Sequence, residues 1–179
     1  AITLAAFMQY ANAADEIQVY TDDINKPGEF GLEVHLNYVS QGSRTRDWPQ
    51  QAPLHRLFSL TPEFSYGLSS RVELGLYLPM TKGIGEDVHL EGVKGRIKYL
   101  VAEEGNPFYW GINGEIGRVS LRTVDHRVNV ELRPILGYKT GNWNFAFNPI
   151  LGWAVSGADS SVPDFSPALK VAYELTKGF

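Results

Sequence analysis

The stretch Phe30-Gly-Leu-Glu-Val-His-Leu-Asn-Tyr38 decides the fold of this chain. Its apolar and polar side chains alternate with a period of two, which is the pattern of a β-strand with one apolar and one polar face. Phenylalanine, leucine, valine and tyrosine share the first face, while glycine, glutamate, histidine and asparagine share the second. The stretch is therefore predicted to be a strand between an apolar and a wet environment.

The same alternation returns in seven further segments, each bounded by polar or turn-forming residues. These segments are residues 58–66, 72–80, 93–101, 108–117, 128–138, 143–153 and 165–175. We therefore predict an all-β chain with about eight antiparallel strands visible. The low mean hydropathy of −0.18 is compatible with strands that alternate in this way, and no apolar run is long enough for a membrane-spanning helix.

The connectors between these segments alternate in length. Long polar connectors take turns with short ones, as in a transmembrane up-and-down β-barrel with external loops on one rim and periplasmic turns on the other. The long connectors are residues 40–55, 81–89, 120–127 and 156–164, and the short ones are residues 67–70, 102–107 and 141–142. The alternation of long and short connectors favours a membrane barrel.

Aromatic residues lie near the ends of the predicted strands. Two belts of rings at the level of the lipid headgroups are typical of outer-membrane barrels. The belt beside the short connectors would contain Phe30, Tyr66, Tyr99, Phe108, Trp110, Tyr138, Trp143 and Tyr173, and the belt near the long connectors would contain Tyr38, Phe58, Trp153 and Phe165. Alternation alone also fits a water-soluble sandwich or lipocalin-like barrel with its apolar face inward, and this alternative stays open.

The polar face of the predicted sheet carries many charged side chains, which a barrel would gather into its lumen. We expect twelve lumen-lining residues: Glu33, His35, Glu63, Glu73, Lys94, Arg96, Lys98, Glu115, Glu131, Arg133, Lys170 and Glu174. Opposite charges on neighbouring strands can pair across the sheet. Two interpretations remain: a network of ion pairs that holds a narrow barrel in shape, and a charged constriction that selects solutes.

The composition excludes several other classes of protein. A chain of 179 residues without a linker-like segment is expected to form one domain. The net charge of −4, with lysines and arginines scattered singly, offers no surface to a nucleic acid. No cysteine is present, so disulfides, thiolate metal sites and thiol nucleophiles are excluded.

The N-terminal residues have the character of an export signal. Residues 1–8 are almost wholly apolar, and Ala11-Asn-Ala13 has the small-x-small form of a signal-peptidase site. We expect residues 1–13 to be the C-terminal part of a cleaved signal peptide, which sends residues 14–179 to a bacterial outer membrane. A short amphipathic helix or a buried strand is the alternative interpretation of residues 1–13.

The C-terminal residues bear on the number of strands. Tyr173-Glu-Leu-Thr-Lys-Gly-Phe179 resembles the short turns of the same chain, each of which leads into a new strand. We therefore expect the barrel to be truncated here and the full-length protein to have more strands. The alternative is an eight-stranded barrel that ends on Phe179 as its terminal aromatic residue.

Five prolines conflict with a regular barrel, because proline cannot donate a hydrogen bond to a neighbouring strand. They lie inside predicted strands, where we expect bulges or local kinks. These residues are Pro62, Pro79, Pro134, Pro149 and Pro167.

Motifs for catalysis are missing, and we do not expect an enzyme. No His-Glu-x-x-His, Gly-x-Ser-x-Gly or phosphate-loop motif occurs, and Gly111, Gly114 and Gly117 follow a strand pattern. The four histidines lie far apart in the sequence, so we expect no metal site and no cofactor. The alternative is a loop-borne metal site made by His89 with Glu86 and Asp87.

Several segments together resemble a family of bacterial outer-membrane barrels. They are Asp15-Glu-Ile-Gln-Val-Tyr-Thr-Asp-Asp-Ile-Asn-Lys-Pro-Gly28, Leu32-Glu-Val-His-Leu-Asn-Tyr38, Leu60-Thr-Pro-Glu-Phe-Ser-Tyr-Gly67, Val72-Glu-Leu-Gly-Leu-Tyr-Leu-Pro79 and Gly92-Val-Lys-Gly-Arg-Ile-Lys-Tyr99. The chain resembles the barrels grouped with the phenol-degradation meta-pathway over most of residues 15–176. The resemblance implies a monomeric barrel of ten or more strands and the uptake of small, often aromatic, compounds.

Three functions follow as hypotheses. The first is a passive outer-membrane channel or transporter for small solutes, aromatic or hydrophobic ones included, with membrane lipid as its other partner. The second is a structural or adhesive barrel with a plugged lumen. The third is an outer-membrane lipid-modifying enzyme, for which no nucleophile with a neighbouring base is identifiable.

Overall fold

The computed structural model describes residues 2–4, 18–155, 160 and 162–175. Within these residues the chain forms one antiparallel β-sheet of eleven strands, connected mostly in sequence order. The predicted cleavage site at Ala11–Ala13 and the terminal Phe179 lie outside the described residues. The described residues contain no helix with the length and apolar character needed to span a membrane.

The long strands match the eight predicted segments, and three short strands are additional. The strands are β1 (Ile2–Leu4), β2 (Phe30–Val39), β3 (Leu57–Gly67), β4 (Val72–Tyr77), β5 (Met80–Lys82), β6 (His89–Leu90), β7 (Gly92–Val101), β8 (Phe108–Val119), β9 (Val128–Thr140), β10 (Trp143–Ala154) and β11 (Asp164–Tyr173). Their order in the sheet is β1-β11-β10-β9-β8-β7-β4-β3-β5-β6, and β2 also pairs with β3. Strand β1 lies in the segment expected to be a signal peptide.

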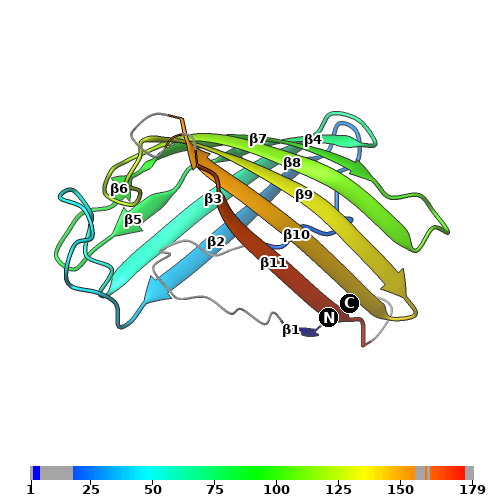
Figure 1. Ribbon diagram of the computed structural model, residues 1–179, viewed down its shortest axis with the longest axis horizontal. Coiled ribbons are helices and arrows are strands. Elements are labelled where there is room, and N and C mark those ends of the chain that lie inside the picture. Colours follow the sequence, from blue (N-terminus) through cyan, green and yellow to red (C-terminus); the bar gives the residue numbers. More distant parts are fainter. Residues whose placement is uncertain (1, 5–17, 156–159, 161, 176–179) are drawn as a thin grey trace.

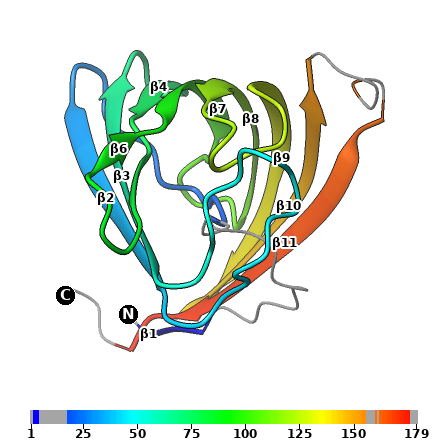
Figure 2. The same cartoon turned by 90° about the vertical axis from the view of Figure 1, so that its left-hand side faces the viewer.

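The sheet is strongly curled and open. Figures 1 and 2 show it wrapping into a half-barrel, with β2 at one side and β11 at the other. In the described part of the chain, β2 and β11 do not pair with each other. The prediction of an all-β antiparallel fold is thus confirmed, whereas a closed barrel is not found in these residues.

The two faces of the sheet differ sharply in polarity. Large apolar side chains cover the outer, convex face, where Phe30 is 80% exposed and Leu36 is 61% exposed. Charged and amide side chains lie buried on the concave face, including Glu63, Arg96 and Asn148. Water-soluble proteins have the opposite arrangement. The alternative of a lipocalin-like barrel with its apolar face inward is therefore wrong for this sheet.

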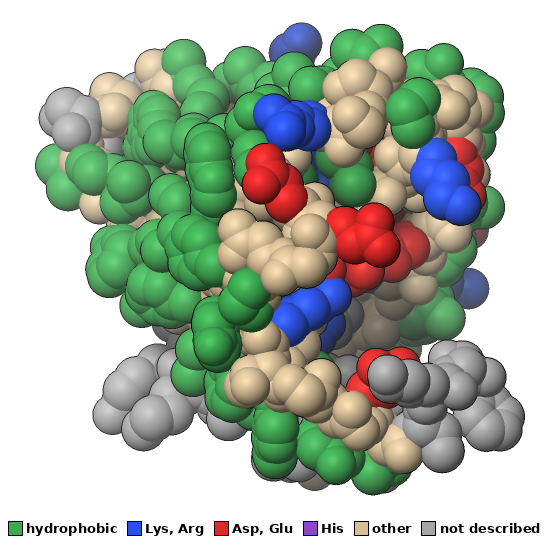
Figure 3. Space-filling model, turned by 90° about the vertical axis from the view of Figure 1, so that its right-hand side faces the viewer, with side chains coloured by type: hydrophobic (Ala, Val, Ile, Leu, Met, Phe, Trp, Pro, Cys, Tyr) green, Lys and Arg blue, Asp and Glu red, His purple; other side chains and the backbone are tan. Residues whose placement is uncertain are grey.

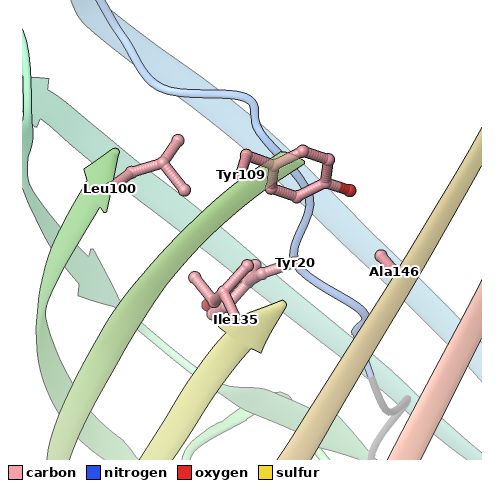
Figure 4. Close-up of a cluster of buried hydrophobic side chains, with 5 residues drawn as sticks. All are labelled: Tyr20, Leu100, Tyr109, Ile135 and Ala146. Carbon is pink, nitrogen blue, oxygen red and sulfur yellow. The ribbon is translucent and has the colours of Figure 1, made fainter. Parts of the chain in front are cut away.

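A strandless stretch, residues 18–29, runs along the concave face, and we call it the inner segment. In Figure 4, Tyr20 of this segment lies among side chains from four neighbouring strands. The buried cluster consists of Tyr20, Leu100, Tyr109, Ile135 and Ala146. The inner segment thus covers part of the polar face and provides a small apolar core there.

Prolines interrupt the hydrogen bonding of the sheet without shifting its register. Glu63 lies opposite Tyr77 and Leu60 opposite Met80, so Pro62 and Pro79 fall between two parts of one continuous register. The segment predicted as one strand over residues 72–80 is therefore divided into β4 and β5. No residue is inserted, so the predicted bulge is absent at this place.

A second group of prolines crosses three neighbouring strands. Pro149 of β10 lies directly opposite Pro167 of β11. On its other side, the pairs Phe147–Leu136 and Leu151–Leu132 place Pro149 opposite Pro134 of β9, and the pairing is interrupted between them. Here too the register is the same on both sides of the prolines.

The long connectors come together at one end of the half-barrel. The Ala52 N–H donates to the Arg122 carbonyl at 2.8 Å, and the Trp48 indole N–H donates to the Leu121 carbonyl at 2.5 Å. Arg122 also pairs with Glu86 at 2.5 Å. Burial opposes its charge, but the bonds from Glu86 and Glu91 raise the pKa of Arg122 above its ordinary value. These contacts fix three of the long connectors to one another.

Candidate functional site

Four charged side chains form the centre of the concave face, and we call them the charged layer: Glu63, Glu73, Arg96 and Lys98. The register places Glu73 directly opposite Lys98 and Gly75 opposite Arg96. The Arg96 guanidinium contacts a Glu63 oxygen at 2.5 Å and a Glu73 oxygen at 2.8 Å. Lys98 Nζ lies 2.9 Å from the same Glu73 oxygen. All four residues are at most 7% exposed.

The Arg96 side chain can reach both Glu63 and Glu73 because its neighbour on β4, Gly75, has no side chain. A Cβ atom at Gly75 would lie 2.4 Å from Arg96 Nε and 2.5 Å from its Cγ. These distances are well below van der Waals contact, and the two ion pairs hold the arginine in place. Gly75 is therefore a steric requirement of the charged layer.

Tyr20 of the inner segment completes this layer. The guanidinium of Arg133 lies 4.7 Å from the centre of its ring, the Arg96 guanidinium lies at 5.5 Å and the Lys98 ammonium nitrogen lies at 5.4 Å. Aromatic faces attract cations over such distances. Burial, followed by the charge of Glu115, raises the pKa of Tyr20 well above its ordinary value. The hydroxyl therefore stays protonated and neutral between the cations.

A second charged cluster lies next to Tyr20 on β8 and β9. Arg133 pairs with Glu131, Nη2 to Oε1, at 2.7 Å. Glu115 accepts hydrogen bonds from the Asn113 amide at 2.9 Å and from the Tyr20 hydroxyl at 3.2 Å. Tyr20 thus contacts both clusters.

Buried side chains of the sheet also bind the backbone of the inner segment. Asn148 accepts from the Tyr20 N–H at 2.6 Å and donates to the Tyr20 carbonyl at 3.1 Å. Lys98 Nζ donates to the Asp23 carbonyl at 2.9 Å, and Glu73 accepts from the Asn25 N–H at 2.7 Å. These side chains form the hydrogen bonds with the backbone that a neighbouring strand would otherwise form. The inner segment is therefore held as part of the sheet interior.

Two cavities with charged side chains in their linings meet at the inner segment. The first, of about 280 Å³, is lined by Tyr20, Tyr77 and Arg133, among others. The second, of about 410 Å³, is lined by Tyr20, Arg96 and further charged groups. Tyr20 and Gln18 line both, so the two cavities adjoin at the inner segment. In the end view of Figure 3, charged side chains gather inside a margin that is largely hydrophobic.

The predicted lumen residues occupy different positions. Glu63, Glu73, Arg96, Lys98 and Arg133 are buried. Lys94, Glu115 and Glu131 are half-buried beside the second cluster, and Lys170 lines the larger of the two cavities. Glu33 and His35 lie on β2 near Glu63, while Glu174 is exposed just beyond β11. The structure thus brings together eleven of the twelve predicted residues around the inner segment and leaves Glu174 at the rim.

The predicted aromatic belts lie near the strand ends. At the end with short connectors, ring pairs are Phe30–Tyr66 with centres 4.6 Å apart, Tyr99–Trp110 at 6.0 Å and Trp143–Tyr173 at 4.8 Å. Phe108 lies opposite Tyr138 in the same region. Toward the long connectors lie Tyr38, Phe58, Trp153 and Phe165. Of the twelve residues, Tyr66, Tyr99 and Trp153 are half-buried and the others are exposed.

Sequence reasoning missed several residues of the site. Tyr77 and Tyr109 lie at the polar-face positions of their alternating strands. This position in the alternation was the available sign that their side chains point inward. Asn113 and Asn148, both 0% exposed, also lie at polar-face positions of their strands. Nothing in the periodicity of the sequence marks Tyr20, because the inner segment does not alternate.

Comparisons of the chain with protein-family models, with curated proteins and with solved structures give no match. The functional interpretation therefore depends on the geometry described above.

Proposed function

We propose that the chain forms the wall of a bacterial outer-membrane β-barrel that acts as a narrow channel for small solutes, with the inner segment as its plug. The observation that carries the proposal is the inverted polarity of the sheet, with apolar side chains outside and ion pairs inside. An outward apolar face is unfavourable in water and favourable in lipid. The two aromatic belts support the same placement.

The proposal requires the sheet to close. In lipid every backbone N–H and C=O group needs a partner, so neither the free edge at β2 nor the part of the β11 edge that β1 leaves unpaired can face hydrocarbon. We propose that strands beyond those described here pair with these edges and complete a monomeric barrel. The cleaved signal peptide expected over residues 1–13 is the export route in this proposal.

The interior suggests the kind of solute. Its cavities have the volume of small molecules, and both charge signs line them. Tyr20, Tyr77 and Tyr109 add aromatic surface to this polar interior. Such a lining can contact a small compound that has an aromatic ring and a polar or charged group. This is the solute class that we propose.

A structural barrel with a plugged lumen is the second candidate. Tyr20, which lines both cavities, favours it because several buried groups hold the residue in place. A channel must move or lose this obstruction, whereas a structural barrel would keep it.

Conductance in planar bilayers tests both candidates. We expect the full-length protein to show low conductance and Tyr20→Ala to show more frequent or larger openings, because the substitution removes a large ring from the lining that the two cavities share. Tyr138→Ala, which removes an exposed outer tyrosine, is the matched control and should behave as the wild type. If both the wild type and Tyr20→Ala are silent after verified insertion, the structural barrel replaces the channel.

A further inference from the structure

Three metal-ligating side chains meet on the concave face at the β2 edge. Glu33 and His35 are two residues apart on β2 and therefore point to the same side of the sheet. The register places Glu63 of β3 directly opposite Glu33. One nitrogen of His35 and one carboxylate oxygen from each glutamate all lie within 4.8 Å of one another. We call this group the edge triad.

The distances within the edge triad are close to those of a metal site. His35 Nε2 lies 3.2 Å from Glu63 Oε2 and 3.9 Å from Glu33 Oε2. Zinc bound tetrahedrally at about 2.1 Å from nitrogen and oxygen separates its ligand atoms by roughly 3.4 Å. The first distance fits already. Glu33 has a side chain that is 68% exposed, so there is space for the small adjustment that the second distance requires.

The charges of the edge triad favour a bound cation. Two glutamates directly opposite each other on neighbouring strands repel. Arg96 offsets part of this charge, but it contacts Oε1 of Glu63 and leaves Oε2 on the side of His35. A cation between Glu33, His35 and Glu63 would neutralise both carboxylates without displacing Arg96.

Neighbouring groups hold two of the ligands in orientation. Arg96 Nε donates to Glu63 Oε1 at 2.8 Å, and the Gln18 amide donates to Glu33 Oε2 at 3.2 Å. Such outer contacts are a regular part of metal sites. His35 lines the smaller cavity and the two glutamates line the larger one, so a fourth position would be open to water or solute.

We propose that Glu33, His35 and Glu63 bind one zinc ion, with its remaining position open to the interior of the half-barrel. One imidazole and two carboxylates suit zinc and similar divalent ions better than soft copper(I), which prefers sulfur ligands. The proposal goes beyond the channel and does not depend on it. It also revises the expectation of no metal site, because that expectation considered the histidines without the register of β3.

Direct zinc binding tests the proposal on the full chain in detergent micelles. Calorimetric titration with zinc chloride should give one equivalent for the wild type, and cobalt(II) should give the visible absorption of a low-symmetry site. Glu33→Gln and His35→Gln should each weaken zinc binding by at least about ten-fold, as loss of a ligand does in metal sites. Glu33 is exposed, so Glu33→Gln tests the site even if His35→Gln misfolds.

His89→Gln is the matched control. His89 of β6 lies 3.7 Å from Glu86 and is not part of the edge triad, so this variant should bind zinc as tightly as the wild type. A wild type that binds no zinc, or a Glu33→Gln variant that binds it as tightly as the wild type, would overturn the proposal. Bilayer conductance is measured separately, so failure of the zinc site and failure of the channel are distinguishable.

Discussion

The hydroxyl oxygens of Tyr20 and Tyr77 lie 2.6 Å apart, although 57 residues separate them in the sequence. This bond joins the inner segment to β4, and the Tyr20 hydroxyl also reaches Glu115. The contact holds the Tyr20 ring where the two cavities adjoin.

Tyr20→Phe should keep the ring and remove this bond. We expect the free energy of unfolding to fall by about 1–2 kcal/mol, because Tyr77 and Glu115 lose a buried partner. Urea unfolding in detergent, followed by tryptophan fluorescence, measures the change. Tyr138→Phe alters an exposed outer hydroxyl and should change stability by less than about 0.5 kcal/mol. Equal effects of the two substitutions would contradict the buried contact.

Gly75→Ala should disturb the charged layer. The added methyl group overlaps Arg96, which its ion pairs hold in position, so we expect a loss of about 1–3 kcal/mol in the free energy of unfolding. Gly95→Ala is a sharp control, because a Cβ there meets nothing within 4 Å. Its effect should be near zero or slightly stabilising. If Gly75→Ala left the free energy of unfolding unchanged, Arg96 would not need the space beside Gly75.

Asn148→Ala should loosen the inner segment. The substitution leaves the N–H and carbonyl of Tyr20 without their side-chain partner, which costs about 1–3 kcal/mol for each buried group. Limited digestion with an endoproteinase that cuts before aspartate should then cleave more rapidly at Asp22 or Asp23. Asn129→Ala removes an asparagine whose amide donates to the His126 carbonyl and should digest like the wild type. Unchanged cleavage of Asn148→Ala would exclude its clamping role.

Ile97→Lys tests the proposed lipid contact of the outer face. Ile97 lies in the middle of β7 and is 54% exposed, so a lysine there should cost about 2–4 kcal/mol in a bilayer. Folding into phospholipid vesicles, monitored by protease protection, should decrease accordingly. Ile84→Lys changes an isoleucine that is 65% exposed in a long connector and should insert normally. The membrane proposal fails if both variants insert as well as the wild type.

The strands and their faces could be predicted because alternation is a local property. Phe30 and Glu33 reveal opposite faces of β2 from the sequence alone, and Arg96 is assigned to the polar face in the same way. The conflict between Pro79 and a continuous strand was also visible in the sequence. The sequence did not show that the register would be the same on both sides of this proline. Local patterns thus determined most of the sheet.

The rest depended on contacts between residues far apart in the chain. Tyr20 is held by side chains of several strands, and no periodicity marks the segment that carries it. Glu63 joins His35 only through the register of β2 with β3, so the sequence spacing of the histidines did not reveal the edge triad. Closure of the barrel likewise depends on partners for the free edges, which no pattern within a strand specifies.

The facing prolines Pro134 and Pro149 limit the backbone hydrogen bonding between β9 and β10. Proline has no N–H, so one rung of the ladder between β9 and β10 has no donor on either side. The two prolines therefore leave a gap in the backbone hydrogen bonding in the middle of β9 and β10, and the residue pairs on both sides of this gap are what join the two strands.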